Sequence, residues 1–298
     1  MVNYKGTDRI FNSTVYSILF LFSAVVVFPL VYILVNSISD PTLVYLGKVI
    51  LIPKDISFEA YSRVLTDPDI WTGYGNTLKY TVLGTMLSIF LTFTAAYPLS
   101  RRDMYGKKTI MFIYTLTMFI NGGLIPTYLI VDGLGLTNTL WGFIIPGCLS
   151  VWNVIVVKTF IGSNIPWEMH EAAMIEGCND FGIFLRIILP LSKPIIAVMI
   201  LFYAVGYWNS YFNAIIYLTD KKLMPLQMFL RNILIGSEMS NMMANGATGA
   251  QEGISIQGQL SESLKYATIV VSSAPILFLY PFIQKYFEKG ILIGSIKG

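Results

Sequence analysis

Six long apolar stretches interrupt the polar positions of this 298-residue chain. Each can cross the ~30 Å of bilayer hydrocarbon as a helix of about 20 residues. No Asp or Glu lies inside any of the six. The pattern predicts an all-α membrane protein, a single transmembrane domain over residues 1–298. Its six spans are expected at about 14–37, 76–99, 109–131, 139–160, 194–218 and 266–282.

Composition agrees with a surface that lipid covers. Hydrophobic residues make up 55% of the chain and charged residues only 12%, against about 25% charged in a soluble domain. One soluble core cannot bury so many apolar side chains, so the lipid bilayer must cover part of them. The net charge of +3 is too small to indicate a nucleic-acid partner.

The basic residues predict the orientation of the spans. If the N-terminus is cytoplasmic, twelve of the 20 Lys and Arg residues fall in inner segments, and eight remain in the much longer outer ones. The short loop 101–108 alone carries four, and short inner loops show this bias most strongly. We therefore expect both termini in the cytoplasm, outer loops at 39–75 and 219–265, and a long inner loop at 161–193. The first apolar stretch is too long for the core of a cleavable signal peptide.

The inner loop 161–193 predicts two short helices that meet at a tight corner. Asn164 can cap the first helix, and Gly177 can end it because glycine enters the left-handed conformation without steric cost. Asn179 can then cap a second, apolar helix that Pro190 stops. Three acidic residues follow the exposed side of the first helix: Glu168, Glu171 and Glu176.

A narrow corner of this kind can enter a groove on another protein, where the Glu171 carboxylate can pair with an Arg or Lys. Movement of the corner would reach the fifth span through Ile187, Leu189 and Pro190. From the residues alone, an amphipathic helix lying on the membrane surface explains the same pattern equally well.

The loop matches a known motif at seven positions across twenty residues: Glu171, Ala172, Ala173, Gly177, Ile187, Leu189 and Pro190. They have the spacing of the EAA loop of ATP-binding-cassette (ABC) importer permeases, and the glycine-punctuated end of the chain, 289–298, resembles the tail of the smaller maltose-transporter permease. The last residues, 280–298, look especially like permeases that import oligo- and polysaccharides with a lipoprotein receptor. The resemblance covers essentially the whole chain.

The resemblance implies a type I importer permease fold in the bacterial cell membrane. It implies a heterodimer with a second, related permease, two copies of an ATPase subunit, an extracytoplasmic solute-binding lipoprotein and an oligosaccharide substrate. Glu171 and Gly177 would seat the coupling loop, residues 161–193, in the ATPase, and Lys297 and Gly298 would also reach towards the ATPase pair. The outer loop 219–265 corresponds to one that probes the binding protein in the maltose system, although its Met- and Asn-rich sequence departs from that relative. Cousins with the same loop carry non-sugar solutes.

The residues that the chain lacks exclude several kinds of catalytic site. Gly106-Lys107-Lys108-Thr109 lacks the upstream glycine of a phosphate-binding loop, so ATP and Mg²⁺ should be bound by a partner and no cofactor by this chain. The single histidine, His170, is expected on a solvated face rather than as a catalyst or metal ligand. Cys148 and Cys178 are expected to be free thiols.

The spans also weigh against two other classes of transport protein. Spans without carboxylates do not favour an ion-coupled secondary transporter. The chain has no filter-like motif or charged ring that would indicate an ion channel.

An aromatic and amide stripe in the fifth span is a candidate substrate path. Tyrosines four residues apart share one side of a helix. Sugar rings stack on aromatic faces while amides bind their hydroxyls. The alternative is the aromatic belt at the membrane interface. The candidate residues are Tyr203, Tyr207, Trp208, Asn209, Tyr211 and Asn213.

Overall fold

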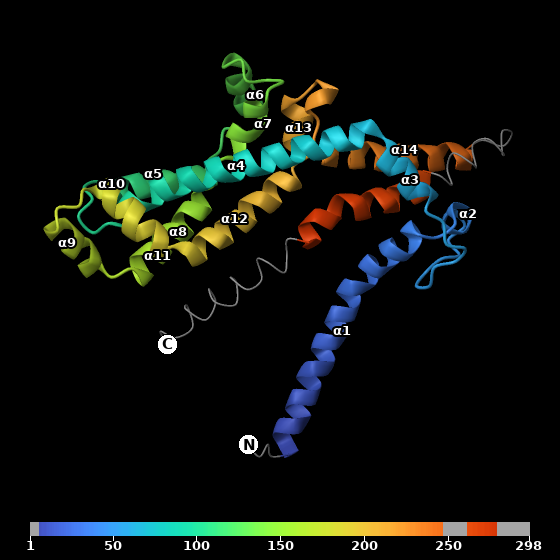
Figure 1. Ribbon diagram of the computed structural model, residues 1–298, viewed down its shortest axis with the longest axis horizontal. Coiled ribbons are helices and arrows are strands. Elements are labelled where there is room, and N and C mark those ends of the chain that lie inside the picture. Colours follow the sequence, from blue (N-terminus) through green and yellow to red (C-terminus); the bar gives the residue numbers. More distant parts are fainter. Residues whose placement is uncertain (1–5, 247–260, 279–298) are drawn as a thin grey trace. The chain divides into compact units, whose positions relative to one another are not determined.

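The computed structural model describes residues 6–246 and 261–278, in which every regular element is helical (Figure 1). A further helix occupies 261–278. The elements up to residue 246 are α1 (Gly6–Ser37), α2 (Pro41–Tyr45), α3 (Glu59–Thr66), α4 (Pro68–Ser100), α5 (Lys107–Phe119), α6 (Leu124–Gly133), α7 (Leu140–Ile144), η1 (Ile145–Gly147), α8 (Val151–Asn164), α9 (Trp167–Ile175), α10 (Asp180–Ile183), η2 (Phe184–Ile188), α11 (Leu189–Leu191), α12 (Lys193–Trp208), α13 (Phe212–Tyr217), η3 (Lys221–Leu223) and α14 (Leu226–Gly246).

The chain divides into two compact units. Among the described residues, the first unit contains 6–68, 230–246 and 261–274, and the second contains 69–229 and 275–278. In the first unit, α1 is strongly apolar and exposed along most of its length. Its C-terminal end packs with Val44, Val49 and Tyr266 in a small apolar cluster. Exposed apolar side chains on this scale are what a lipid-facing helix requires.

The second unit is built around α4, which runs for 33 residues without a break. Its core joins Phe93 and Ala96 of α4 to Val154 and Val157 of α8 and Met199 of α12, all nearly or fully buried. Most large side chains on the opposite side of α4 are exposed, including Met86 and Phe90. This division gives α4 one face packed in the core of the unit and one exposed apolar face.

Two of the expected spans are bent helix pairs, and a third bend joins the helices of the expected inner loop to the fifth span. α5 and α6 meet at 112°, α7–η1 and α8 at 56°, and α10–α11 and α12 at 81°. At the first break, Gly123 has φ +86° and its N–H is bonded to Asn121 Oδ1. This left-handed backbone suits glycine and ends the helical ladder.

By length and composition, two described helices could each cross a membrane alone, Asp8–Ser37 and Pro68–Ser100. Counting each bent pair as one span raises the total to five in the described residues. The helix 261–278 contains most of the sixth expected span, whose last residues lie outside the described part of the chain.

Candidate coupling surface

The corner of the coupling loop is a complete Schellman turn. The Gly177 N–H donates to the Met174 carbonyl at 3.0 Å, and the Cys178 N–H donates to the Ala173 carbonyl at 2.9 Å. Gly177 has φ +80°, which only glycine adopts without cost. Asn179 Oδ1 then accepts from a backbone N–H at 2.8 Å and caps α10. The helix end at Gly177 and the helix cap at Asn179, both expected from the sequence, are confirmed.

The beginning of α9 differs from the expectation. Asn164 is the last residue of α8, where its side chain donates to the Phe160 carbonyl at 3.0 Å. Pro166 occupies the cap position of α9 and makes no side-chain hydrogen bond. The prediction that Asn164 caps this helix is therefore wrong, because α8 extends further than the apolar pattern indicated.

One face of α9 is buried and the other is exposed. Ala173 is buried in the core of the second unit, whereas Glu171 and Ala172 lie on the exposed side together with Glu176. Ile175 is 86% exposed at the end of the helix. Carboxylates around an exposed apolar side chain form a surface suited to a partner that offers cations and a hydrophobic groove.

The rest of the loop leads directly into α12. Ile187 lies in the π-helical turn η2, and Leu189 and Pro190 belong to α11. The expectation that Pro190 stops the helix is wrong, because the helical run includes Pro190 and ends at Leu191, two residues beyond the expected last residue Leu189. The bend of 81° follows at Ser192. A π turn next to a sharp bend marks a place where helical hydrogen bonding changes, which is common at functional sites.

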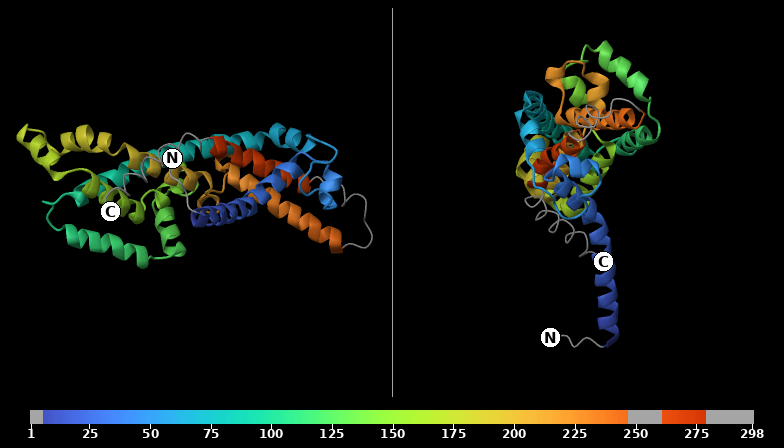
Figure 2. Two further views of the ribbon diagram at one scale, coloured as in Figure 1. Left: turned by 90° about the horizontal axis from the view of Figure 1, so that it is seen from below. Right: turned by 90° about the vertical axis from the view of Figure 1, so that its right-hand side faces the viewer.

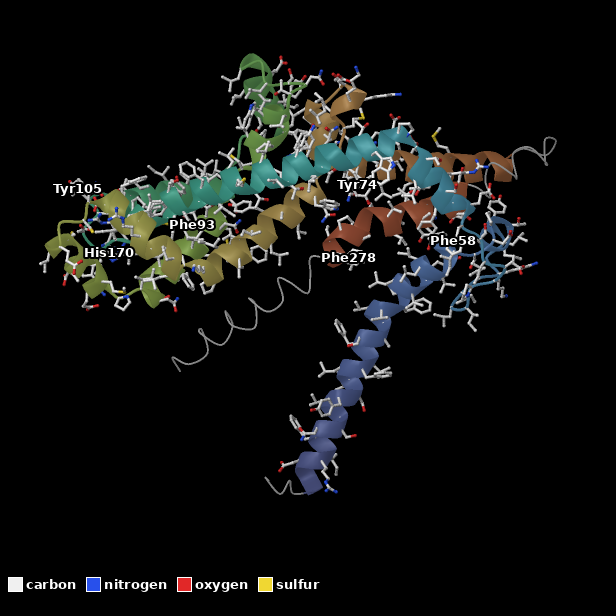
Figure 3. The ribbon with its side chains drawn as sticks, in the orientation of Figure 1. Phe58, Tyr74, Phe93, Tyr105, His170 and Phe278 are labelled. Carbon is white, nitrogen blue, oxygen red and sulfur yellow. The ribbon has the colours of Figure 1, made fainter. Side chains whose placement is uncertain are left out.

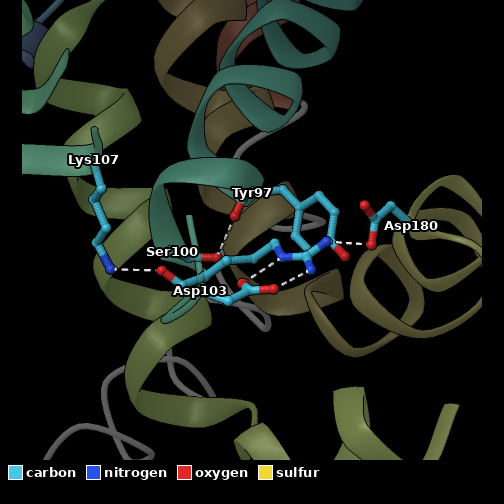
Figure 4. Close-up of polar contacts among 6 residues, drawn as sticks. Tyr97, Ser100, Asp103, Lys107 and Asp180 are labelled. Atoms are coloured by element: carbon cyan, nitrogen blue, oxygen red, sulfur yellow. Dashed lines mark hydrogen bonds and ion pairs between the residues drawn. The ribbon is translucent and has the colours of Figure 1, made fainter. Parts of the chain in front are cut away.

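An ion-pair network joins this loop to the end of α4 (Figure 4). The Arg101 guanidinium pairs with Asp180, the first residue of α10, and with Asp103. Hydrogen bonds from Arg101 hold the pKa of Asp103 below its usual value. Lys107 Nζ donates to the Arg101 carbonyl at 2.8 Å. In the sequence Arg101 is one of four cations in a short loop, and no local pattern links it to Asp180.

His170 is buried, so the expectation of a solvated position is wrong. Only 4% of it is exposed. Its ring stacks on Trp167 at 4.8 Å and on Tyr97 of α4 at 5.9 Å between centroids. Figure 3 labels it among the side chains at this end of the second unit. The aromatic residue three positions earlier was the sequence signal that could have indicated this burial.

Burial lowers the pKa of His170, and the charge of Arg101 lowers it further against the opposing effects of Asp103 and Asp180. The unfolded chain therefore takes up a proton near pH 6.5 that the folded chain resists, so stability is lost as pH falls below that value. We expect thermal stability to fall more between pH 7.5 and 5.5 in the native protein than in His170→Phe, which keeps the ring stack. Equal losses in a detergent melting assay would contradict this prediction.

The expected aromatic stripe divides into two parts. Tyr203 and Tyr207 are buried against α4, where their hydroxyls lie 2.7 Å from Thr92 Oγ1 and 3.2 Å from Ser88 Oγ. Trp208 is also buried, with its ring 6.3 Å from that of Tyr74. α12 ends at Trp208, so the remaining candidates do not continue the same helical face. Asn209 and Tyr211 are exposed and Asn213 is half-buried.

The two cysteines and the two C-terminal residues complete the set of residues singled out in the sequence. Within the described residues, no cluster of His, Cys, Asp or Glu could hold a metal ion. Cys148 is a buried free thiol and Cys178 a half-buried one. Lys297 and Gly298 lie outside the described residues.

Comparisons with known proteins identify the family. No family model matches the chain. A polygalacturonan/rhamnogalacturonan transport system permease protein of Bacillus subtilis (strain 168) is 41% identical over 98% of this chain and 99% of its own length. A probable ABC transporter permease protein of the same organism is 33% identical over 75% of this chain and 68% of its own length. The chain belongs to the permeases of ABC transport systems.

A solved structure agrees with this assignment. One chain of a bacterial ABC transporter involved in the import of the acidic polysaccharide alginate is 33% identical, with a TM-score of 0.83. The match covers 96% of this ABC permease and 100% of that chain. The protein is thus a helical membrane subunit of an ABC importer and not itself an enzyme, since a separate subunit hydrolyses ATP.

Proposed function

We propose that this ABC permease moves an oligosaccharide across the bacterial cell membrane, driven by ATPase subunits that engage the coupling loop. The observation that carries this proposal is the exposed face of α9, where Glu171 and Glu176 flank Ile175 beside the Gly177 corner. The alternative, a helix resting on the membrane, is disfavoured because carboxylates on this face would be repelled by anionic lipid headgroups.

The proposed assembly follows the resemblance to type I importers. This chain pairs with a second, related permease above two copies of the ATPase, which bind ATP and Mg²⁺, and an extracytoplasmic lipoprotein delivers the cargo. Six spans place both termini in the cytoplasm, and the four cations of the loop 101–108 support this orientation. Lys297 and Gly298 are proposed to reach the ATPase pair.

The cargo is proposed from the relatives. Polygalacturonan and alginate in their names are polysaccharides, and the second is described as acidic. An oligosaccharide that contains uronic acids is therefore the first compound to test. Tyr211, Asn209 and Asn213 are the stripe residues with free surface for a sugar. The buried Tyr203, Tyr207 and Trp208 would instead hold the shape of the path.

The test is uptake by the complete transporter in proteoliposomes. We expect ATP-dependent accumulation of labelled oligogalacturonide, and at least ~10-fold less of a neutral oligosaccharide of equal length, about 1.4 kcal/mol of discrimination. Accumulation of an amino acid or phosphate in place of either sugar would overturn the oligosaccharide proposal. Accumulation without ATP would overturn the proposed energy source.

A further inference from the structure

The last turn of α4 is held by three elements of the coupling loop. Tyr97 lies between His170 of α9 and Phe184 of η2, with ring centroids 5.9 and 5.3 Å away. One turn later, Arg101 forms its ion pair with Asp180 of α10. The Arg101 side chain is 14% exposed and that of Asp180 is 67% exposed, so the contact is anchored on the buried side of Arg101 and open to water at Asp180. Movement of the coupling loop therefore reaches α4 directly through these side-chain contacts. It also reaches α12 through the continuous backbone.

The opposite end of α4 holds a different segment, residues 222–226. The Asn76 amide donates to two carbonyls of this segment at 2.7 and 3.1 Å, and the Tyr80 hydroxyl to a third at 2.6 Å. Thr77 Oγ1 accepts from the Leu226 N–H at 2.8 Å in a buried contact. These hydrogen bonds fix the start of α14, which leads into the long loop expected on the outer side.

One unbroken helix, α4, joins the contacts with the coupling loop to the contacts with residues 222–226. From Asn76 to its last residue Ser100, α4 spans about 36 Å at 1.5 Å per residue, more than the ~30 Å of bilayer hydrocarbon. Figures 1 and 2 both place the coupling loop at the end of α4 that terminates at Ser100. α4 and α12 are also linked laterally through Ser88 and Thr92. A continuous helix packed on this scale transmits displacement rather than absorbing it.

We propose that α4 is a rod that carries movement of the coupling loop to the 222–226 segment, with Arg101 and Tyr97 as positioning residues at one end and Asn76 and Thr77 at the other. The proposal rests on the coupling role of the loop given under the proposed function. It adds that nucleotide binding on the inner side changes the segment that begins the 219–265 outer loop.

The experiment measures hydrogen exchange of amides 222–226 in the complete transporter, with and without ATP. In the native protein, ATP should alter their exchange. Asp180→Asn should reduce the ATP-induced change by roughly two- to thirtyfold, the usual range for a residue that carries coupling, and should lower uptake per ATP hydrolysed. Asp103→Asn is the matched control, since it removes the other carboxylate of Arg101 without touching the coupling loop.

A second pair of variants tests the far end. Asn76→Ala should leave ATP hydrolysis intact but lower uptake per ATP. Thr94→Val should not, because the Thr94 hydroxyl bonds only to carbonyls of its own helix. The proposed role of α4 is overturned if ATP leaves hydrogen exchange at 222–226 unchanged in the native transporter. It is also overturned if Asp180→Asn and Asp103→Asn alter the ATP-induced change in exchange to the same extent. Exchange is read without cargo, so a wrong sugar assignment leaves this result intact. A failure of ATPase docking would instead appear as lost co-purification.

Discussion

Replacing Gly177 by aspartate is expected to abolish transport. An added Cβ at this glycine meets no other atom of the chain within 4 Å, so the substitution leaves internal packing unchanged. Aspartate tolerates φ +80° at a cost of about 1–2 kcal/mol. The side chain would project from the corner into the proposed ATPase groove. Obstructing a central contact costs about 2 kcal/mol or more, so uptake should fall at least ~30-fold.

Gly135→Asp is the matched control for this variant. Gly135 also has a positive φ, +66°, and open space around its Cβ position, but it lies between α6 and α7, away from the coupling loop. Uptake, ATP hydrolysis and co-purification of the ATPase are measured for both variants. Full assembly and normal uptake in Gly177→Asp would refute the coupling role of the corner.

Replacing Gly84 by alanine is expected to destabilise the second unit strongly. The new Cβ would lie 2.6 Å from the ring of Tyr207. That ring cannot retreat easily, because it is buried and its hydroxyl contacts Ser88 Oγ and the Ile144 carbonyl, each at 3.2 Å. Overpacking of this kind costs about 1–3 kcal/mol. The melting temperature in detergent, followed by size-exclusion chromatography after heating, should fall by several degrees.

Gly75→Ala on the same helix should not destabilise the protein and is expected to stabilise it slightly. No atom lies within 4 Å of its Cβ position, and alanine favours a helix over glycine by up to about 1 kcal/mol. An unchanged or higher melting temperature is therefore expected for this variant. If Gly84→Ala melted like Gly75→Ala, the close packing of α4 on α12 would be wrong.

Local signals allowed the corner to be predicted from sequence. Gly177 and Asn179 act on their own neighbours, through a left-handed turn and a side-chain cap, so residue type and spacing were sufficient. The apolar stretches likewise indicated a helical membrane protein, because hydropathy depends on composition alone. The seven positions of the EAA motif led to the family that the relatives confirm.

The features that were missed depend on distant partners. Arg101 and Asp180 are 79 residues apart, and no local pattern indicates that they meet. The burial of His170 depends on Tyr97 from another helix. The break between α5 and α6 was hidden because the residues on both sides are apolar and the total length suits one straight span. Backbone conformation at Gly123, rather than hydropathy, decides that bend.

The length of α4 has a consequence for the surrounding lipid. Its uncharged part, residues 80–100, measures about 32 Å, close to the hydrocarbon thickness of a bilayer. The twelve residues before it continue for about 18 Å more and carry Asp69 and Lys79. In a membrane of different thickness, α4 can therefore shift along its own axis so that more or less of this polar extension lies within the bilayer. This form of hydrophobic matching leaves the helix straight.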